Sequence, residues 1–314
     1  MPENCDSPGS SRLPCHRTLK KGWFVPGVLL PLLFIALLQG CRGDSGSGKL
    51  QVLTSIEPLA YFVERIGGDR VSVSVMVPPG GDPHTYEPTP RQMARLGSAA
   101  LFVKAGSGVE FELNWMPRFL ALNRGLRVCD ASEGVLLIPM EHLDHDVPGG
   151  RQGLFDPHYW LSPSNARLIA ANVARSLALV DPSHHGEYEA NLSKLDAELQ
   201  TLDATLRQRL GGVKNRRFIV FHPAWGYFAK EFGLKQIAAE EEGKTLTPVQ
   251  MARVIELARA FSIRTVFVSP QFSSAQAEAI ANDIGGSTAT VDPLSRDYQE
   301  NLRHAADAFA GGMR

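Results

Sequence analysis

One continuous apolar stripe constrains the fold of this chain more than any other feature of its sequence. Apolar side chains recur there at spacings of four and three, which places them on one face of an α-helix. The stripe consists of Tyr188, Leu192, Leu195, Leu199, Leu202, Leu206 and Leu210. It predicts a helix of about 24 residues, roughly 36 Å long. Such a helix is either half of a coiled coil or a support that packs against two lobes.

The segments on both sides of this stripe alternate between strand patterns and helix patterns. Before it, strands are predicted at 51–55, 71–77 and 99–105 and helices at 58–66, 90–97 and 164–179. After it, strands are predicted at 217–221, 236–239, 265–269 and 287–291 and helices at 227–232, 247–262, 274–284 and 298–309. This alternation is typical of parallel sheets covered by helices. We therefore expect an α/β fold with two lobes joined by one long helix.

The first 40 residues have the pattern of a lipoprotein signal peptide. A positively charged stretch precedes an apolar run from Trp23 to Leu38, and residues 38–41, Leu-Gln-Gly-Cys, resemble a bacterial lipobox. We expect a signal peptide over 1–40, lipidation of Cys41 and a flexible tether over 41–49. The alternative is an uncleaved membrane anchor. Both interpretations put the bulk of the chain outside the cytoplasm, in the periplasm or at the cell surface.

The same patterns predict the limits of the domains. We expect an N-terminal lobe over 50–185, a bridging helix over 186–212 and a C-terminal lobe over 213–314. The 314 residues carry a formal net charge of −1, which argues against the basic surface of a nucleic-acid-binding protein. The four cysteines form no CxxC pair, so we expect neither a disulfide framework nor a cysteine zinc site.

Three histidines and one aspartate follow predicted strands or lie in the loops after them. His222 and Asp292 come at the ends of strands, whereas His84 and His158 lie in loops. Ligands of parallel α/β sheets bind outside the carboxyl ends of the strands. Three imidazoles and one carboxylate would suit four-coordinate Zn²⁺, with Mn²⁺ as the alternative. A single histidine near a strand end is also a common structural residue, and no compact motif links these four, so the residues alone leave both interpretations open.

Several motifs, in order along the chain, resemble those of the zinc/manganese ABC-transporter solute-binding lipoproteins. They are residues 54–59 (TSIEPL), 66–69 (IGGD), 77–88 (VPPGGDPHTYEP), 155–163 (FDPHYWLSP), 221–228 (FHPAWGYF), 270–273 (PQFS) and 291–294 (VDPL). The resemblance implies that the metal ligands are His84, His158, His222 and Asp292. It also implies a fold of two α/β lobes with parallel sheets, bridged by one long rigid helix.

The resemblance further implies a function in transport. The protein would capture a divalent metal ion in the cleft between its lobes and deliver it to the membrane permease of an ABC importer. Relatives that bind manganese often have glutamate at the third ligand, so His222 favours zinc. A lipid anchor and a monomeric state belong to the same expectation. The alternatives are a secreted zinc hydrolase, against which four protein ligands and the lack of an HExxH helix argue, and a surface adhesin.

Residues beside the predicted ligands leave further alternatives open. His142 and His145 form either an accessory metal site or part of a solvated polar loop. Glu57 and Glu87 either orient ligand histidines or form surface ion pairs. Four aromatic residues near the ligands either pack in the core, which is the simpler interpretation, or form walls of the site: Tyr86, Trp160, Trp225 and Tyr227.

Overall fold

The computed structural model describes residues 48–140, 155–240 and 245–313. From Lys49 onward the chain forms one compact unit. The predicted signal peptide, the lipidation site Cys41 and the loop with His142 and His145 lie outside the described residues. Among the described helices, none is long and apolar enough to cross a membrane. The limits expected above for the two lobes and the bridging helix stay predictions.

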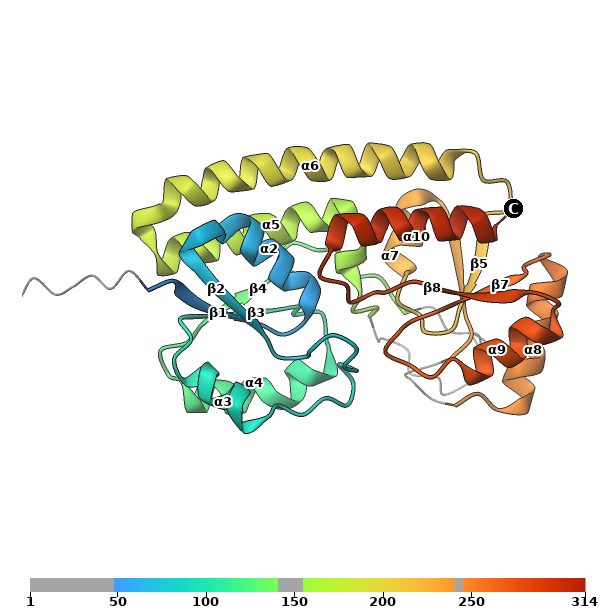
Figure 1. Cartoon of the computed structure of the whole chain (residues 1–314), viewed down its shortest axis with the longest axis horizontal. Coiled ribbons are helices and arrows are strands. Elements are labelled where there is room, and N and C mark those ends of the chain that lie inside the picture. Colours follow the sequence, from blue (N-terminus) through green and yellow to red (C-terminus); the bar gives the residue numbers. More distant parts are fainter. Residues whose placement is uncertain (1–47, 141–154, 241–244, 314) are drawn as a thin grey trace, which may run out of the picture. The chain divides into compact units, whose positions relative to one another are not determined.

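Four parallel strands form the first sheet, in the order β2-β1-β3-β4 (Figure 1). The strands are β1 (Leu50–Thr54), β2 (Val71–Val75), β3 (Leu101–Lys104) and β4 (Arg127–Asp130). The first half also contains the helices α2 (Glu57–Gly67), α3 (Pro90–Gly97), α4 (Glu110–Leu122) and α5 (Pro163–Val180) and the 3-10 turns η1 (Gly68–Arg70), η2 (Tyr159–Leu161) and η3 (Pro182–His184). Since every pairing in the sheet is parallel, the loops that follow the strands leave from the same edge.

The second half repeats this topology, because its four parallel strands have the order β6-β5-β7-β8. They are β5 (Arg217–Val220), β6 (Lys235–Ala238), β7 (Thr265–Val268) and β8 (Ser287–Thr290). The helices are α7 (Gly226–Phe232), α8 (Pro248–Ala260), α9 (Ala275–Asp283) and α10 (Tyr298–Gly312). The predicted α/β class with two parallel sheets is therefore confirmed.

Helix α6 (His185–Gly211) is 27 residues long and contains the apolar stripe. It packs against α2 and α5 of the first half and against α10 of the second (Figure 1). Six of the seven side chains of the stripe are buried, and Leu192 is partly buried. The stripe therefore packs against other helices of the same chain. This confirms the prediction of a helix that packs as a support against both parts of the chain, and the coiled-coil alternative is wrong.

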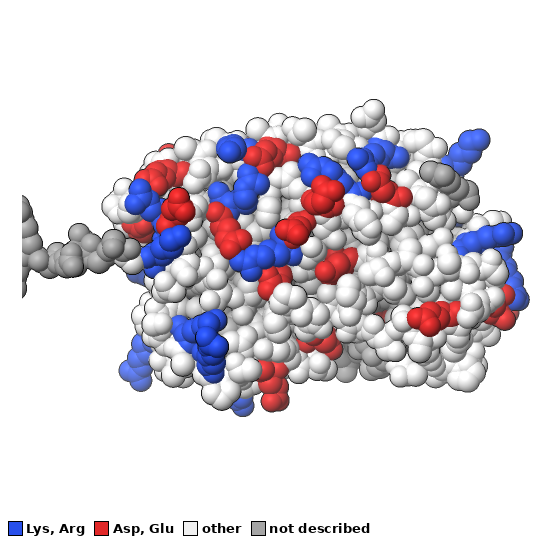
Figure 2. All heavy atoms as spheres, in the orientation of Figure 1, with Lys and Arg blue, Asp and Glu red and all other residues white. Residues whose placement is uncertain are grey.

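Ion pairs on the surface accompany this packing. Figure 2 shows basic and acidic side chains interspersed on one face of the described residues. Pairs that join α6 to its neighbours are Arg65–Glu198 (2.7 Å), Arg70–Glu187 (2.7 Å), Arg167–Asp196 (2.5 Å) and Arg209–Asp307. Surface ion pairs of this kind contribute about 0–1 kcal/mol each. Burial of its apolar face therefore contributes most of the free energy that holds α6 against the rest of the chain.

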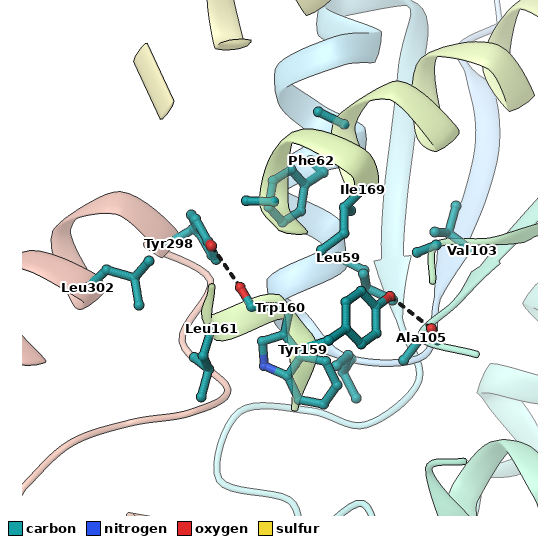
Figure 3. Close-up of a cluster of buried hydrophobic side chains, with 14 of the residues drawn as sticks. Leu59, Phe62, Val103, Ala105, Tyr159, Trp160, Leu161, Ile169, Tyr298 and Leu302 are labelled. Carbon is teal, nitrogen blue, oxygen red and sulfur yellow. Dashed lines mark hydrogen bonds between the residues drawn. The ribbon is translucent and has the colours of Figure 1, made fainter. Parts of the chain in front are cut away.

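The segment that follows His158 is fixed by contacts with both halves. In η2 the hydroxyl of Tyr159 donates to the carbonyl of Ala105, 2.8 Å away, and Tyr298 of α10 donates to the carbonyl of Trp160 at 2.7 Å (Figure 3). Tyr159, Trp160 and Tyr298 are all at most 2% exposed. These buried hydrogen bonds restrict the position of the chain directly beside a predicted ligand.

The sequence analysis predicted no element between residues 106 and 140, where the structure has α4 and β4. Pro117 lies inside α4, and Leu113, Leu120 and Leu122 point to solvent, so the helical apolar pattern is weak. Strand β4 lies at the edge of its sheet, and only one of its four residues is buried. Neither segment therefore carries the pattern by which the other elements were predicted.

Candidate metal centre

The three predicted ligand histidines come together at one pocket between the two halves. His84, His158 and His222 all line it. The Nε2 atoms of His158 and His222 are 3.4 Å apart, and the ring centres of His84 and His222 are 5.5 Å apart. His158 and His222 are buried, with 6% and 4% of their surface exposed, whereas His84 is partly exposed. Residues 64 or more positions apart in the chain, such as His158 and His222, thus meet here.

Each of these histidines has its Nδ1 atom held by a carboxylate. The pairs are His84–Glu110 at 2.9 Å, His158–Asp156 at 2.8 Å and His222–Glu240 at 2.5 Å. A carboxylate that accepts from Nδ1–H fixes the tautomer and leaves the lone pair of Nε2 for another partner. The same pairing orients histidines that ligate metals in proteins.

The electrostatic surroundings set different proton affinities for two of these rings. Burial lowers the pKa of His222 below its ordinary value, although the hydrogen bond to Glu240 opposes this shift. Burial also acts to lower the pKa of His84, but the hydrogen bond and charge of Glu110 outweigh it, and the pKa is raised. His222 is therefore neutral at neutral pH, as a metal ligand must be, and His84 keeps a proton to higher pH.

Helix α7 packs closely against Asp156, whose carboxylate orients His158. The hydroxyl of Tyr227 donates to the backbone carbonyl of Asp156 at 3.0 Å. A Cβ atom at Gly226 would lie 2.5 Å from the Asp156 carboxylate, so only glycine allows this close approach. The FHPAWGYF motif therefore supplies both a predicted ligand, His222, and the support for the partner of His158.

Asp292 lies two residues after β8, next to the pocket. Its Oδ1 accepts hydrogen bonds from the side chain of Gln271 at 2.7 Å and from the backbone N–H of Leu294 at 2.9 Å. The wall of the pocket here is formed by Gln271, Pro293 and Leu294. Among the described residues, no group of three or more His, Cys, Asp or Glu side chains is placed so that it could already hold a metal ion. The four-ligand set accordingly stays a prediction.

The structure decides between the alternatives for the neighbouring side chains. Glu57 forms an ion pair with Arg296 at 3.0 Å, and Glu87 is exposed. Within the described residues, the carboxylates that contact the three histidines belong to other residues. Trp160 lines the pocket, with its ring centre 5.3 Å from that of His158. The other aromatic residues pack elsewhere: Trp225 against Phe228 and Phe309, Tyr227 against Asp156, and Tyr86 against Phe111 and Gln92.

Sequence analysis missed the carboxylates that do hold the histidines. Asp156 is two residues before His158, so the DPH triplet offered a local signal. Glu110 and Glu240 are 26 and 18 residues away from their histidines, in positions that no spacing rule links to them. Phe272 was quoted only as part of a motif, yet its ring lies 4.4 Å from that of His222.

Two α/β halves that gather carboxylate-backed histidines between them define a metal-binding solute-binding protein. The chain belongs to the family described as "Zinc-uptake complex component A periplasmic", whose model matches residues 52–312. This family consists of metal-binding proteins of ABC transporters.

Relatives and solved structures agree with this assignment. The chain is 31% identical to the high-affinity zinc uptake system protein ZnuA of Bacillus subtilis, covering 82% of this chain and 83% of the relative. It is 29% identical to the iron-binding protein YfeA of Yersinia pestis, covering 88% and 90%. A crystal structure of a ZnuA deletion mutant with zinc bound is 39% identical, with a TM-score of 0.78, and the match covers 85% of this chain and 98% of that chain.

Proposed function

We propose that this protein captures one Zn²⁺ ion outside the cytoplasm and delivers it to the permease of an ABC importer. The observation that supports this most is the convergence of three histidines whose Nδ1 atoms are all held by carboxylates. Such pairs leave Nε2 of each histidine free to bind a metal ion, and the Nε2 atoms of His158 and His222 lie 3.4 Å apart. The metal is the transported substrate, so the site must bind it tightly and also release it.

The proposed ligands are His84, His158 and His222, with Asp292 as the fourth. Three nitrogens and one oxygen suit tetrahedral zinc, whereas the alternative, Mn²⁺, prefers more oxygen ligands. The names of the relatives do not agree on a metal, since one is called a zinc uptake protein and another an iron-binding protein. The nitrogen-rich set of this chain is the reason for proposing zinc.

Location and partners follow from the family and from the N-terminal sequence. The family is described as periplasmic. We propose that Cys41 is lipidated and anchors the protein, as a monomer, to the outer side of a membrane. The protein has no catalytic role in this proposal, because four protein ligands leave zinc no open position for a substrate or an activated water.

Metal titration tests the proposal. The purified protein is expected to bind one zinc ion tightly per chain and to prefer zinc to manganese. Elemental analysis after purification, followed by competition between the two metals in a calorimeter, measures both quantities. Two equally tight zinc ions per chain, or displacement of zinc by an equal concentration of manganese, would contradict the proposal.

Zinc affinity is expected to fall as the pH is lowered. Protons compete with the metal for imidazole nitrogens, and the raised pKa of His84 means that this competition begins there at a higher pH. The lowered pKa of His222 makes its nitrogen available down to a lower pH. The affinity should therefore decline from about pH 8 to pH 5, more steeply as further histidines protonate. Calorimetry in buffers of different ionisation enthalpy counts the released protons, and a flat affinity would exclude histidine ligation.

A further inference from the structure

Gln271 holds one oxygen of the predicted ligand Asp292. It follows β7 in the PQFS motif and lines the pocket beside Phe272. Its Nε2 donates to Asp292 Oδ1 at 2.7 Å, and the backbone N–H of Leu294 donates to the same oxygen at 2.9 Å. Within the described part of the chain, both hydrogen bonds accepted by this carboxylate thus end on Oδ1.

The orientation of the Gln271 amide follows from this contact. Its Oε1 atom is buried and has no hydrogen-bond partner among the described residues. The opposite orientation would place Oε1 against Asp292 Oδ1, where two acceptors repel each other. An unpaired buried acceptor costs free energy. The amide therefore keeps the orientation in which its Nε2 donates to Asp292, although this leaves its Oε1 without a hydrogen bond among the described residues.

This arrangement affects how Asp292 can bind a metal. With two N–H groups on Oδ1, the carboxylate offers a metal mainly Oδ2, and one oxygen beside three nitrogens completes a tetrahedron. A carboxylate free to use both oxygens would raise the coordination number and suit Mn²⁺, which prefers oxygen-rich six-coordinate sites. The number of free oxygens on Asp292 thus bears on the choice of metal.

We propose that Gln271 is a positioning residue that determines metal specificity by restricting Asp292 to one ligating oxygen. The proposal rests on the function proposed above. Gln271 does not contact the metal in this scheme. Its effect reaches the metal only through Asp292, and this route separates it from a residue that merely supports the loop.

The variant Gln271→Leu tests this role, because leucine keeps much of the volume but has no N–H group. Zinc and manganese dissociation constants are measured by competition. We expect the manganese-to-zinc affinity ratio to rise by roughly 10-fold, at the lower end of what loss of a ligand's hydrogen-bond partner costs in affinity. Gln276→Leu is the matched control, since Gln276 lies on α9 and bonds the backbone of Leu246 outside the pocket. It should leave the ratio unchanged.

The same substitution in an Asp292→Asn background completes a double-mutant cycle. If Gln271 acts through Asp292, its effect on the ratio disappears there. An unchanged ratio in Gln271→Leu, or an effect that persists without Asp292, overturns the proposal. An equal gain in both affinities also overturns it, because Gln271 would then only compete with the metal for the carboxylate.

Misfolding of the leucine variant and failure of the proposed function can each be told apart from failure of this proposal. Gln271→Met, which preserves the side-chain length, replaces the leucine variant if that variant fails to fold, and its ratio is judged in the same way. Failure of the proposed function has a different signature: the unmodified protein binds no zinc tightly, or Asp292→Asn leaves zinc affinity unchanged.

Discussion

Replacing His222 by glutamate is expected to lower zinc affinity by more than about 100-fold, because loss of an outer hydrogen-bond partner alone already costs about 10–100-fold. The substitution exchanges a nitrogen for a harder oxygen, so manganese affinity should fall less than zinc affinity. Competition titrations of both metals measure the two effects. The ratio of the affinities is the decisive quantity, since it does not depend on a general loss of structure.

The surroundings of His222 add a second expected result for this variant. The new carboxylate would be buried next to Glu240, which is itself 1% exposed. Two buried carboxylates repel each other, so one of them takes up a proton unless a cation lies between them. The metal-free variant should therefore melt at a lower temperature than the unmodified protein, and manganese should restore part of the difference.

A matched control is available on α10, where His304 is exposed. His304→Glu makes the same chemical change on the surface and should leave both affinities and the melting temperature nearly unchanged. If His222→Glu behaves like this control, His222 is not a ligand.

Truncating Leu199 to alanine is expected to lower the free energy of unfolding by about 2–5 kcal/mol. Leu199 is fully buried in the middle of α6, the helix that packs against both halves. Removing its side chain loses buried apolar contacts and leaves a cavity that the rigid surroundings fill only in part. Denaturant unfolding followed by circular dichroism measures the change.

The corresponding control is Leu179→Ala on α5. Leu179 is 75% exposed, so the same truncation there should change the free energy of unfolding by no more than about 0.5 kcal/mol. Equal effects of the two truncations would mean that the apolar face of α6 does not stabilise the chain, in conflict with its packing in the structure.

The sequence by itself determined the architecture of this protein. Helix α6 was predicted because leucines at spacings of three and four lie on one face of a helix, and that face must be buried. The parallel sheets were predicted because strand and helix patterns alternate through both halves. His84, His158 and His222 follow strands or lie in the loops beyond them, where ligands of parallel sheets bind. These positions alone left a structural role open, and the resemblance to the solute-binding lipoproteins implied that the three histidines are ligands.

Tertiary structure alone decided how the site is held. Glu110 and Glu240 reach His84 and His222 from other elements, and the bond of Gln271 to Asp292 joins the loops after β7 and β8. Their separations along the chain follow from the lengths of intervening helices and strands, so they produce no motif. Local patterns record what each segment buries, whereas a hydrogen bond between two segments depends on how the folded elements pack. For that reason the sequence predicted which histidines are ligands, and only the folded chain showed which carboxylates orient them.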